Sequence, residues 1–150
     1  MIENVERGID YDLASCLEFN PQPFTTNDIE KVLAVYEGEN DGDDWQWVIA
    51  LKDGRFTFLQ GGCDYTGWDC QSWATSAFYA TAEEAARGAL GDITVEASKG
   101  PYTAGLGHMI TILSGEYMSN AKEIYYLLMQ QLLGGKFETW REKMDKEFGL

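Results

Sequence analysis

The stretch Trp45-Gln46-Trp47-Val48-Ile49-Ala50-Leu51-Lys52-Asp53-Gly54-Arg55-Phe56-Thr57-Phe58-Leu59-Gln60 decides the fold. Two runs rich in aromatic and β-branched residues flank Asp53-Gly54, a dipeptide typical of a two-residue hairpin turn with positive φ angles. Such a turn predicts that Leu51 lies opposite Phe56, and this pair sets the register of the two strands. The register places six apolar side chains on one face: Trp45, Trp47, Ile49, Leu51, Phe56 and Phe58. The hairpin is therefore predicted to anchor the core.

The segments around this hairpin predict a single α+β domain over residues 1–150. Thr81 and Glu84 form a capping-box pattern, and Gly134-Gly135 separates two amphipathic segments near the C-terminus. We expect a short helix over 10–17, strands over 30–37 and 73–80, a helix from Thr81 to Leu90, an edge strand over 93–97, and helices on both sides of Gly134-Gly135. Residues 100–115 fit either a strand or a helix. The expected architecture is an antiparallel sheet of three to five strands with helices packed on one face and a helical C-terminal third.

Acidic residues dominate the charge of the chain. The net charge is −14, and residues 1–75 hold 15 of the 25 acids but only 4 of the 11 bases. This excess disfavours direct binding to nucleic acid or to an anionic membrane and favours a basic protein partner, although charge alone also keeps a small protein soluble. The N-terminal residues lack the pattern of a secretory signal, no apolar stretch is long enough to span a bilayer, and cysteines are few. These features predict a cytoplasmic protein.

One acidic cluster lies between two predicted strands, in Glu37-Gly38-Glu39-Asn40-Asp41-Gly42-Asp43-Asp44. An EF-hand calcium loop needs ligands at alternating positions, a central glycine and a glutamate at its twelfth position between two helices. The spacing and the flanking strands both differ from that pattern. We therefore expect a solvated turn.

The segment 61–73, Gly-Gly-Cys-Asp-Tyr-Thr-Gly-Trp-Asp-Cys-Gln-Ser-Trp, combines glycines, aromatics, carboxylates and thiols. Asp64 and Asp69, with Asp53, could bind a divalent cation or divide acid and base roles, but aspartate in a Gly-rich loop more often caps its own backbone. The aromatic residues of the segment, Tyr65, Trp68 and Trp73, have the composition of a binding hot spot. The alternative is that they fold back to close the end of the sheet.

The cysteines carry little predicted chemistry. Six residues separate Cys63 from Cys70, too many for a zinc knuckle, and a site that adds Cys16 and His108 would join distant segments without support from spacing. We expect the thiols to act as small buried hydrophobes. Because His108 is the only histidine and no phosphate-binding or hydrolase motif is present, the sequence predicts no catalytic residues, no cofactor and no enzyme activity.

The segment Cys63-Asp64-Tyr65-Thr66-Gly67-Trp68-Asp69-Cys70-Gln71 carries a resemblance. Together with the preceding hairpin and the helix over Thr81–Leu90, it is similar to a group of short uncharacterised proteins of bacteria and their phages. The resemblance implies a phage or mobile-element origin but no activity. Small acidic proteins of such origin include anti-CRISPR and related anti-defence proteins, which act as inhibitors by binding and blocking a host protein.

Two functions follow as hypotheses. The first is a non-catalytic interaction protein that binds and blocks a basic host protein, which could itself bind nucleic acid. Its expected contact residues are the acids of both loops and two aromatic anchors: Glu37, Glu39, Asp41, Asp43, Asp44, Asp64, Tyr65, Trp68 and Asp69. The alternative is a small-molecule or metal-binding domain with its site at the 61–73 loop.

Overall fold

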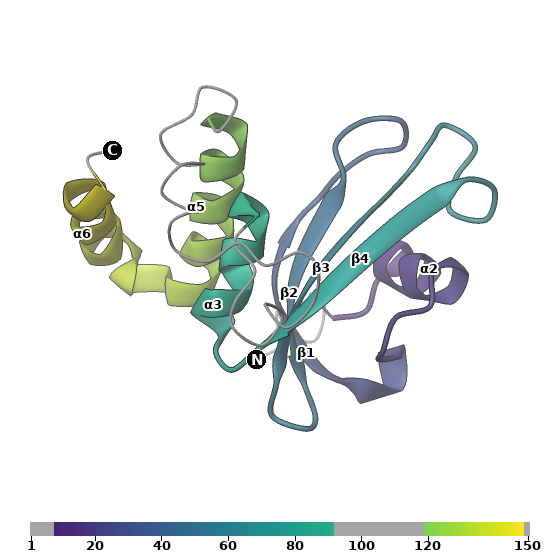
Figure 1. Cartoon of the computed structure of the whole chain (residues 1–150), viewed down its shortest axis with the longest axis horizontal. Helices are drawn as coiled ribbons and strands as arrows, with labels where there is room; N and C mark the ends of the chain where they lie inside the picture. Colours follow the sequence, from purple (N-terminus) through teal and green to yellow (C-terminus); the bar gives the residue numbers. More distant parts are fainter. Residues whose placement is uncertain (1–7, 92–118, 149–150) are drawn as a thin grey trace.

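The computed structural model describes residues 8–91 and 119–148 and has an α+β fold (Figure 1). Its strands are β1 (Ile29–Tyr36), β2 (Trp45–Leu51), β3 (Phe56–Cys63) and β4 (Ser72–Tyr79). Its α-helices are α2 (Tyr11–Phe19), α3 (Ala82–Ala86), α5 (Ser119–Leu133) and α6 (Phe137–Phe148). Short 3₁₀ turns are η1 (Thr26–Asp28), η2 (Arg87–Leu90) and η5 (Gly134–Lys136).

The four described strands form one antiparallel sheet in the order β1-β2-β3-β4, so each strand pairs with its neighbour in the chain. The expected α+β class, the antiparallel sheet and the helical C-terminal third are confirmed. The helices α3, α5 and α6 lie on one side of the sheet, as expected, and α2 lies on the other side (Figure 1). β2 is buried along nearly its whole length because both faces of the sheet are covered there.

The predicted register of the central hairpin is wrong by one residue. The chain turns through three residues, since the amide of Leu51 donates to the carbonyl of Arg55 at 2.9 Å and that of Gly54 donates to the carbonyl of Leu51 at 3.0 Å. Within this turn only Gly54 adopts a positive φ, of 95°, so Asp53 is spared the strained conformation that a two-residue turn would demand. Phe56 consequently pairs with Ala50. A shift of one residue moves every side chain of β3 to the opposite face.

The core on the α2 side contains the tryptophans of β2 and the apolar side of α2. Asp10 caps this helix by accepting a hydrogen bond from the amide of Leu13 at 2.9 Å. Helix α2 thereby presents Leu13, Cys16 and Leu17 to the sheet. The other buried members are Phe24, Ile29, Val32, Trp45, Trp47, Ile49, Leu51, Leu59, Cys63 and Trp68.

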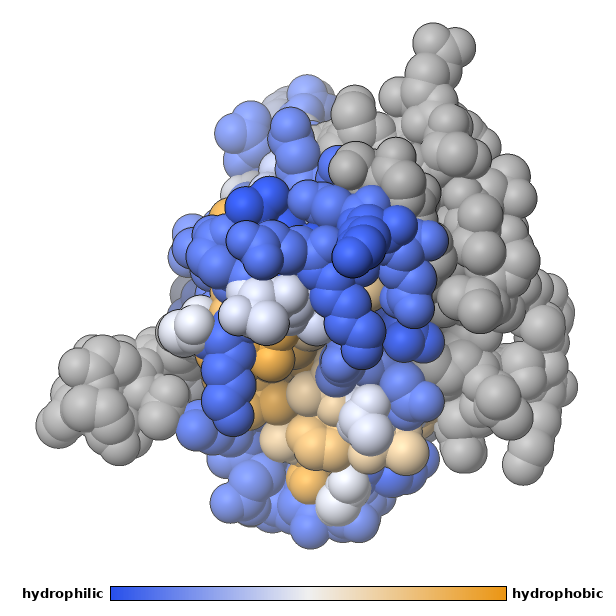
Figure 2. Space-filling view, turned by 90° about the vertical axis from the view of Figure 1, so that its left-hand side faces the viewer, coloured by the Kyte–Doolittle hydropathy of each residue, from blue (hydrophilic) through white to orange (hydrophobic). Residues whose placement is uncertain are grey.

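The second core lies between the sheet and the other helices, and it receives Phe56 and Phe58 because of the observed register. Thr81 caps α3 through the amide of Glu84 at 3.1 Å, and the turn after η2 ends at Gly91 in the left-handed conformation. The buried members from the helical segments are Ala85, Ala86, Leu90, Ile124, Tyr125, Leu128, Met129, Phe137 and Met144. Figure 2 faces the C-terminal helices and shows hydrophobic surface framed by hydrophilic side chains.

At one point, a side chain of α5 forms hydrogen bonds with the free backbone edge of strand β1. Gln131 accepts a hydrogen bond from the amide of Val35 at Oε1 and donates one from Nε2 to the carbonyl of Val35, both at 2.9 Å. A single amide side chain therefore satisfies the two groups that a further strand would otherwise pair with.

Some predicted segments lie outside the described residues, namely the edge strand over 93–97 and the ambiguous segment 100–115. Within the described ranges, no helix has both the length and the apolar character needed to cross a membrane.

Candidate functional site

Two loops meet at one end of the sheet and form the candidate site. The first, residues 37–44, joins β1 to β2, and the second, residues 64–71, joins β3 to β4 (Figure 1). The amide of Asp41 donates to the carbonyl of Cys63 at 2.8 Å, which fixes the first loop to the start of the second. We call this surface the loop end and define it by residues 37–44, 64–71 and Trp73.

The acids of the first loop are largely exposed and unneutralised. Glu37, Glu39, Asp41 and Asp43 are exposed, whereas Asp44 is partly buried. The ion pairs among the described residues involve Arg55 with Asp53 and Arg141 with two acids of α6, so no described cation forms an ion pair with a loop-end carboxylate. The hydroxyl of Tyr36 donates to Asp43 at 2.6 Å, and this bond to a carboxylate, followed by burial, raises the pKa of the tyrosine. The loop end is therefore a concentrated negative surface.

Asp44 and Trp73 form a fixed pair beside these acids. The indole Nε1 of Trp73 donates to Oδ1 of Asp44 at 3.2 Å, and Nε2 of Gln60 donates to Oδ2 at 3.1 Å. Gly62 lies beneath the pair: a Cβ there would lie 2.2 Å from Asp44 Oδ1 and 2.8 Å from Trp73 Nε1. A glycine is therefore needed for the approach of the two side chains. The indole is 44% exposed although its N–H is bonded within the chain.

The second loop closes on itself, and its aromatic residues divide between surface and core. Asp64 accepts hydrogen bonds from the amide and hydroxyl of Thr66, so it caps its own loop. Tyr65 is 78% exposed. Trp68 is 3% exposed, its ring centroid lies 5.2 Å from that of Trp45, and its Nε1 donates to Asp12 of α2 at 3.0 Å. The expectation of an exposed anchor at Trp68 is therefore wrong, because this ring folds back into the core.

The three cysteines occupy different environments. Cys16 and Cys63 are buried, as expected, whereas Cys70 is exposed. Burial, with smaller contributions from Cys63 and Asp12, raises the pKa of the Cys16 thiol to about 12, and burial also raises that of Cys63. Both thiols stay protonated at neutral pH and are poor ligands or nucleophiles in that form. Among the described residues, which exclude His108, no group of three or more His, Cys, Asp or Glu side chains could bind a metal ion.

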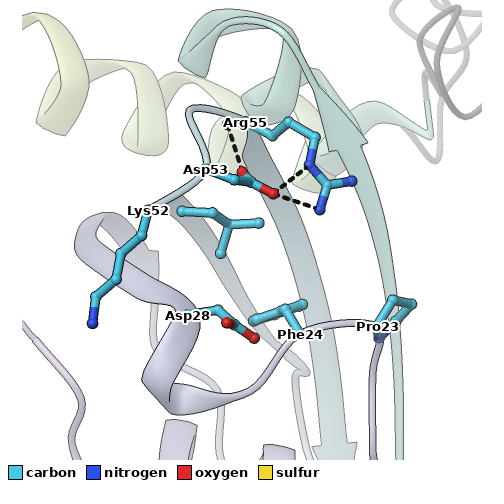
Figure 3. A pocket seen from close by; sticks show the side chains of 7 residues that line it. Pro23, Phe24, Asp28, Lys52, Asp53 and Arg55 are labelled. Atoms are coloured by element: carbon cyan, nitrogen blue, oxygen red, sulfur yellow. Dashed lines mark hydrogen bonds and ion pairs between the residues drawn. The ribbon is translucent and has the colours of Figure 1, made fainter.

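Asp53 does not join the carboxylates of the 61–73 loop. It lies at the tip of the β2–β3 hairpin, at the opposite end of the strands, and forms an ion pair with Arg55 at 2.9 Å. This pair borders a hollow of about 460 Å³ whose lining includes Phe24, Leu51 and Asp28 (Figure 3). Asp28 accepts the amide of Thr25 at 2.8 Å, so both carboxylates of the hollow are bonded within the chain.

Comparison with models of protein families, with curated proteins and with solved structures found no match. The resemblance of Cys63–Gln71 to short bacterial and phage proteins stays a sequence-based expectation.

Sequence reasoning named every acid of the loop end but missed how Asp44 and Trp73 combine. The two residues are 29 positions apart, and only the strand register brings them together across Gly62. A usable signal was present in Gly61-Gly62, since adjacent glycines inside a strand indicate close approach of other groups.

Proposed function

We propose that this protein is a non-catalytic interaction protein whose loop end binds a basic surface of a partner protein. The observation that carries the proposal is the group of exposed carboxylates for which no described residue supplies an ion-paired cation. A concentrated negative surface speeds association with a basic partner and selects against acidic ones. Tyr65 and Trp73 add exposed aromatic area of the kind that contributes most to interface affinity.

Blocking of the partner is part of the same proposal, because a bound loop end would cover the basic surface that the partner uses for other ligands. A partner that normally binds nucleic acid fits this chemistry, since such proteins concentrate lysine and arginine on one face. The phage or mobile-element origin implied by the resemblance is consistent with an inhibitor of a host protein.

The experiment compares two triple variants with the same change in net charge. The first, E37Q/E39Q/D41N, neutralises loop-end acids for which the described structure gives no side-chain hydrogen bond, and asparagine suits the φ of 58° at position 41. The control, E30Q/E142Q/E147Q, neutralises exposed acids elsewhere. Immobilised protein captures partners from nuclease-treated lysate, and the purified partner is then titrated at several salt concentrations.

We expect the loop-end variant to weaken binding and to flatten its salt dependence, while the control variant binds as the wild type does. Equal weakening by both variants would show that net charge alone attracts the partner. Unchanged binding by the loop-end variant would place the interface elsewhere. Either of these two results would refute the proposal.

A further inference from the structure

The inference concerns the sheet face beside the loop end and rests on the function proposed above. On the face that also carries the second core, the strands align a row of polar side chains, Tyr36, Gln46, Gln60 and Thr75. The next row outward consists of Asp44, Gly62 and Trp73, as their contacts across Gly62 show. The face therefore changes from apolar beneath the helices to acceptor-rich at the loop end.

The pair formed by Asp44 and Trp73 offers two kinds of contact. Each oxygen of Asp44 accepts one hydrogen bond from a neutral donor, at 3.2 Å and 3.1 Å, and a carboxylate has about four acceptor positions. Its charge is not neutralised by any described cation. The indole of Trp73, oriented by its bond to Asp44, exposes ring surface on which a cation can stack.

Gln46 provides an independent observation on the same face. Its side chain is 7% exposed, and its Oε1 has no hydrogen-bond partner within the described part of the chain. The residue lies between Tyr36 and Gln60 in the register, one row inward from Asp44. A buried acceptor without a donor costs free energy, so this face favours a group that brings hydrogen-bond donors to it.

We propose that the Asp44–Trp73 pair is a docking site for an arginine side chain of the basic partner. A guanidinium group is planar, stacks on indole and presents five N–H donors in a fork that matches a carboxylate. A lysine ammonium is a compact, strongly hydrated charge with three donors, and it gains less from stacking. The surrounding acids attract either cation, so the selection of arginine is the specific contribution of this pair.

The test uses two fluorescent peptides of equal charge, one with four Gly-Arg repeats and one with four Gly-Lys repeats. Binding to the full chain is measured by fluorescence anisotropy at low salt. We expect the wild type to prefer the arginine peptide by about two- to fivefold, the factor that an exposed cation–π contact supplies. The W73L variant should bind both peptides equally, and circular dichroism checks that it is folded.

One further variant separates the contribution of the Asp44–Trp73 pair from that of the surrounding negative charge, and a second assigns the resonance of Trp73. The variant E37Q/E39Q/D41N should weaken both peptides by the same factor and retain the preference for arginine. The W73F variant identifies the indole N–H resonance of Trp73, which should shift in the wild type on addition of the arginine peptide and move less with lysine.

The outcomes distinguish the two proposals. Equal affinity of the wild type for both peptides, or a preference that survives in W73L, overturns the arginine site and leaves the basic partner standing. Failure of both peptides to bind at low salt overturns the arginine site and also contradicts the proposed function. A preference for arginine that W73L abolishes, together with the resonance shift, supports the site.

Discussion

The two hydrogen bonds between Gln131 and the backbone of Val35 predict a measurable loss of stability in the variant Gln131→Leu. Leucine has similar volume but cannot bond either backbone group, so one N–H and one C=O of the edge strand lose their partner. Each such bond contributes about 0.5–1.5 kcal/mol net, and removal of both should lower the free energy of unfolding by about 1–3 kcal/mol. The site is only partly buried, so water can replace part of the lost bonding, which favours the lower half of that range.

Urea unfolding followed by circular dichroism measures this difference. With an m-value of about 2 kcal/mol/M, the unfolding midpoint should fall by roughly 0.5–1.5 M. Gln130→Leu is the matched control because residue 130 is the exposed neighbour on the same helix. The amide of Val35 should also exchange faster with deuterium in the Gln131 variant. Equal midpoints for the two variants, with unchanged exchange at Val35, would refute the reasoning.

Three further outcomes can be checked. Gly88→Ala should destabilise the fold by about 1–3 kcal/mol in urea titrations, because the added Cβ would lie 2.3 Å from Cγ of Phe58. Gly135→Ala is the control and should be near neutral, since the space around Gly135 is open. Equal effects of the two substitutions would contradict the packing argument. A thiol reagent at pH 8 should modify one cysteine, Cys70, in native protein and all three in urea, and rapid native reaction of a second thiol would contradict the burial. The free energy of unfolding should fall as pH rises from about 9 to about 12, because the Cys16 thiol loses its proton at lower pH in the unfolded chain than in the folded one. The contribution of Cys16 to this fall should be absent in the Cys16→Ala variant.

The hairpin and most elements of the described chain were predictable because their signals are local. Alternating apolar residues around Asp53-Gly54 predict two paired strands, and Thr81 predicts the start of α3. The register was not predictable from the same dipeptide. Gly54 serves a two-residue and a three-residue turn equally well, and the choice between them moves Phe56 and Phe58 to the other face.

The candidate site shows the same division between local and distant information. The acids of residues 37–44 could be assigned to a solvated turn from composition alone. The burial of Trp68 could not be predicted in this way, because its indole N–H donates to Asp12, 56 positions earlier in the chain. Trp73 also donates to an acid distant in the sequence, Asp44, yet it is 44% exposed, whereas Trp68 is 3% exposed. Tertiary context therefore decides which aromatic residue of the loop can meet a partner.

The order of the strands has a consequence for synthesis on the ribosome. Each of the four described strands pairs with its neighbour in the chain, so this sheet can assemble as soon as β4 has emerged. Helix α5 begins forty residues after β4 ends, a delay of about 2–8 s at ordinary elongation rates. During this interval Ala34 of β1 lacks the cover that α5 gives this strand in the finished fold. A nascent chain stalled when residue 91 has just left the ribosome should therefore crosslink to a ribosome-associated chaperone more strongly than one stalled when α6 has left it. Equal crosslinking would argue against an assembled sheet that is still uncovered.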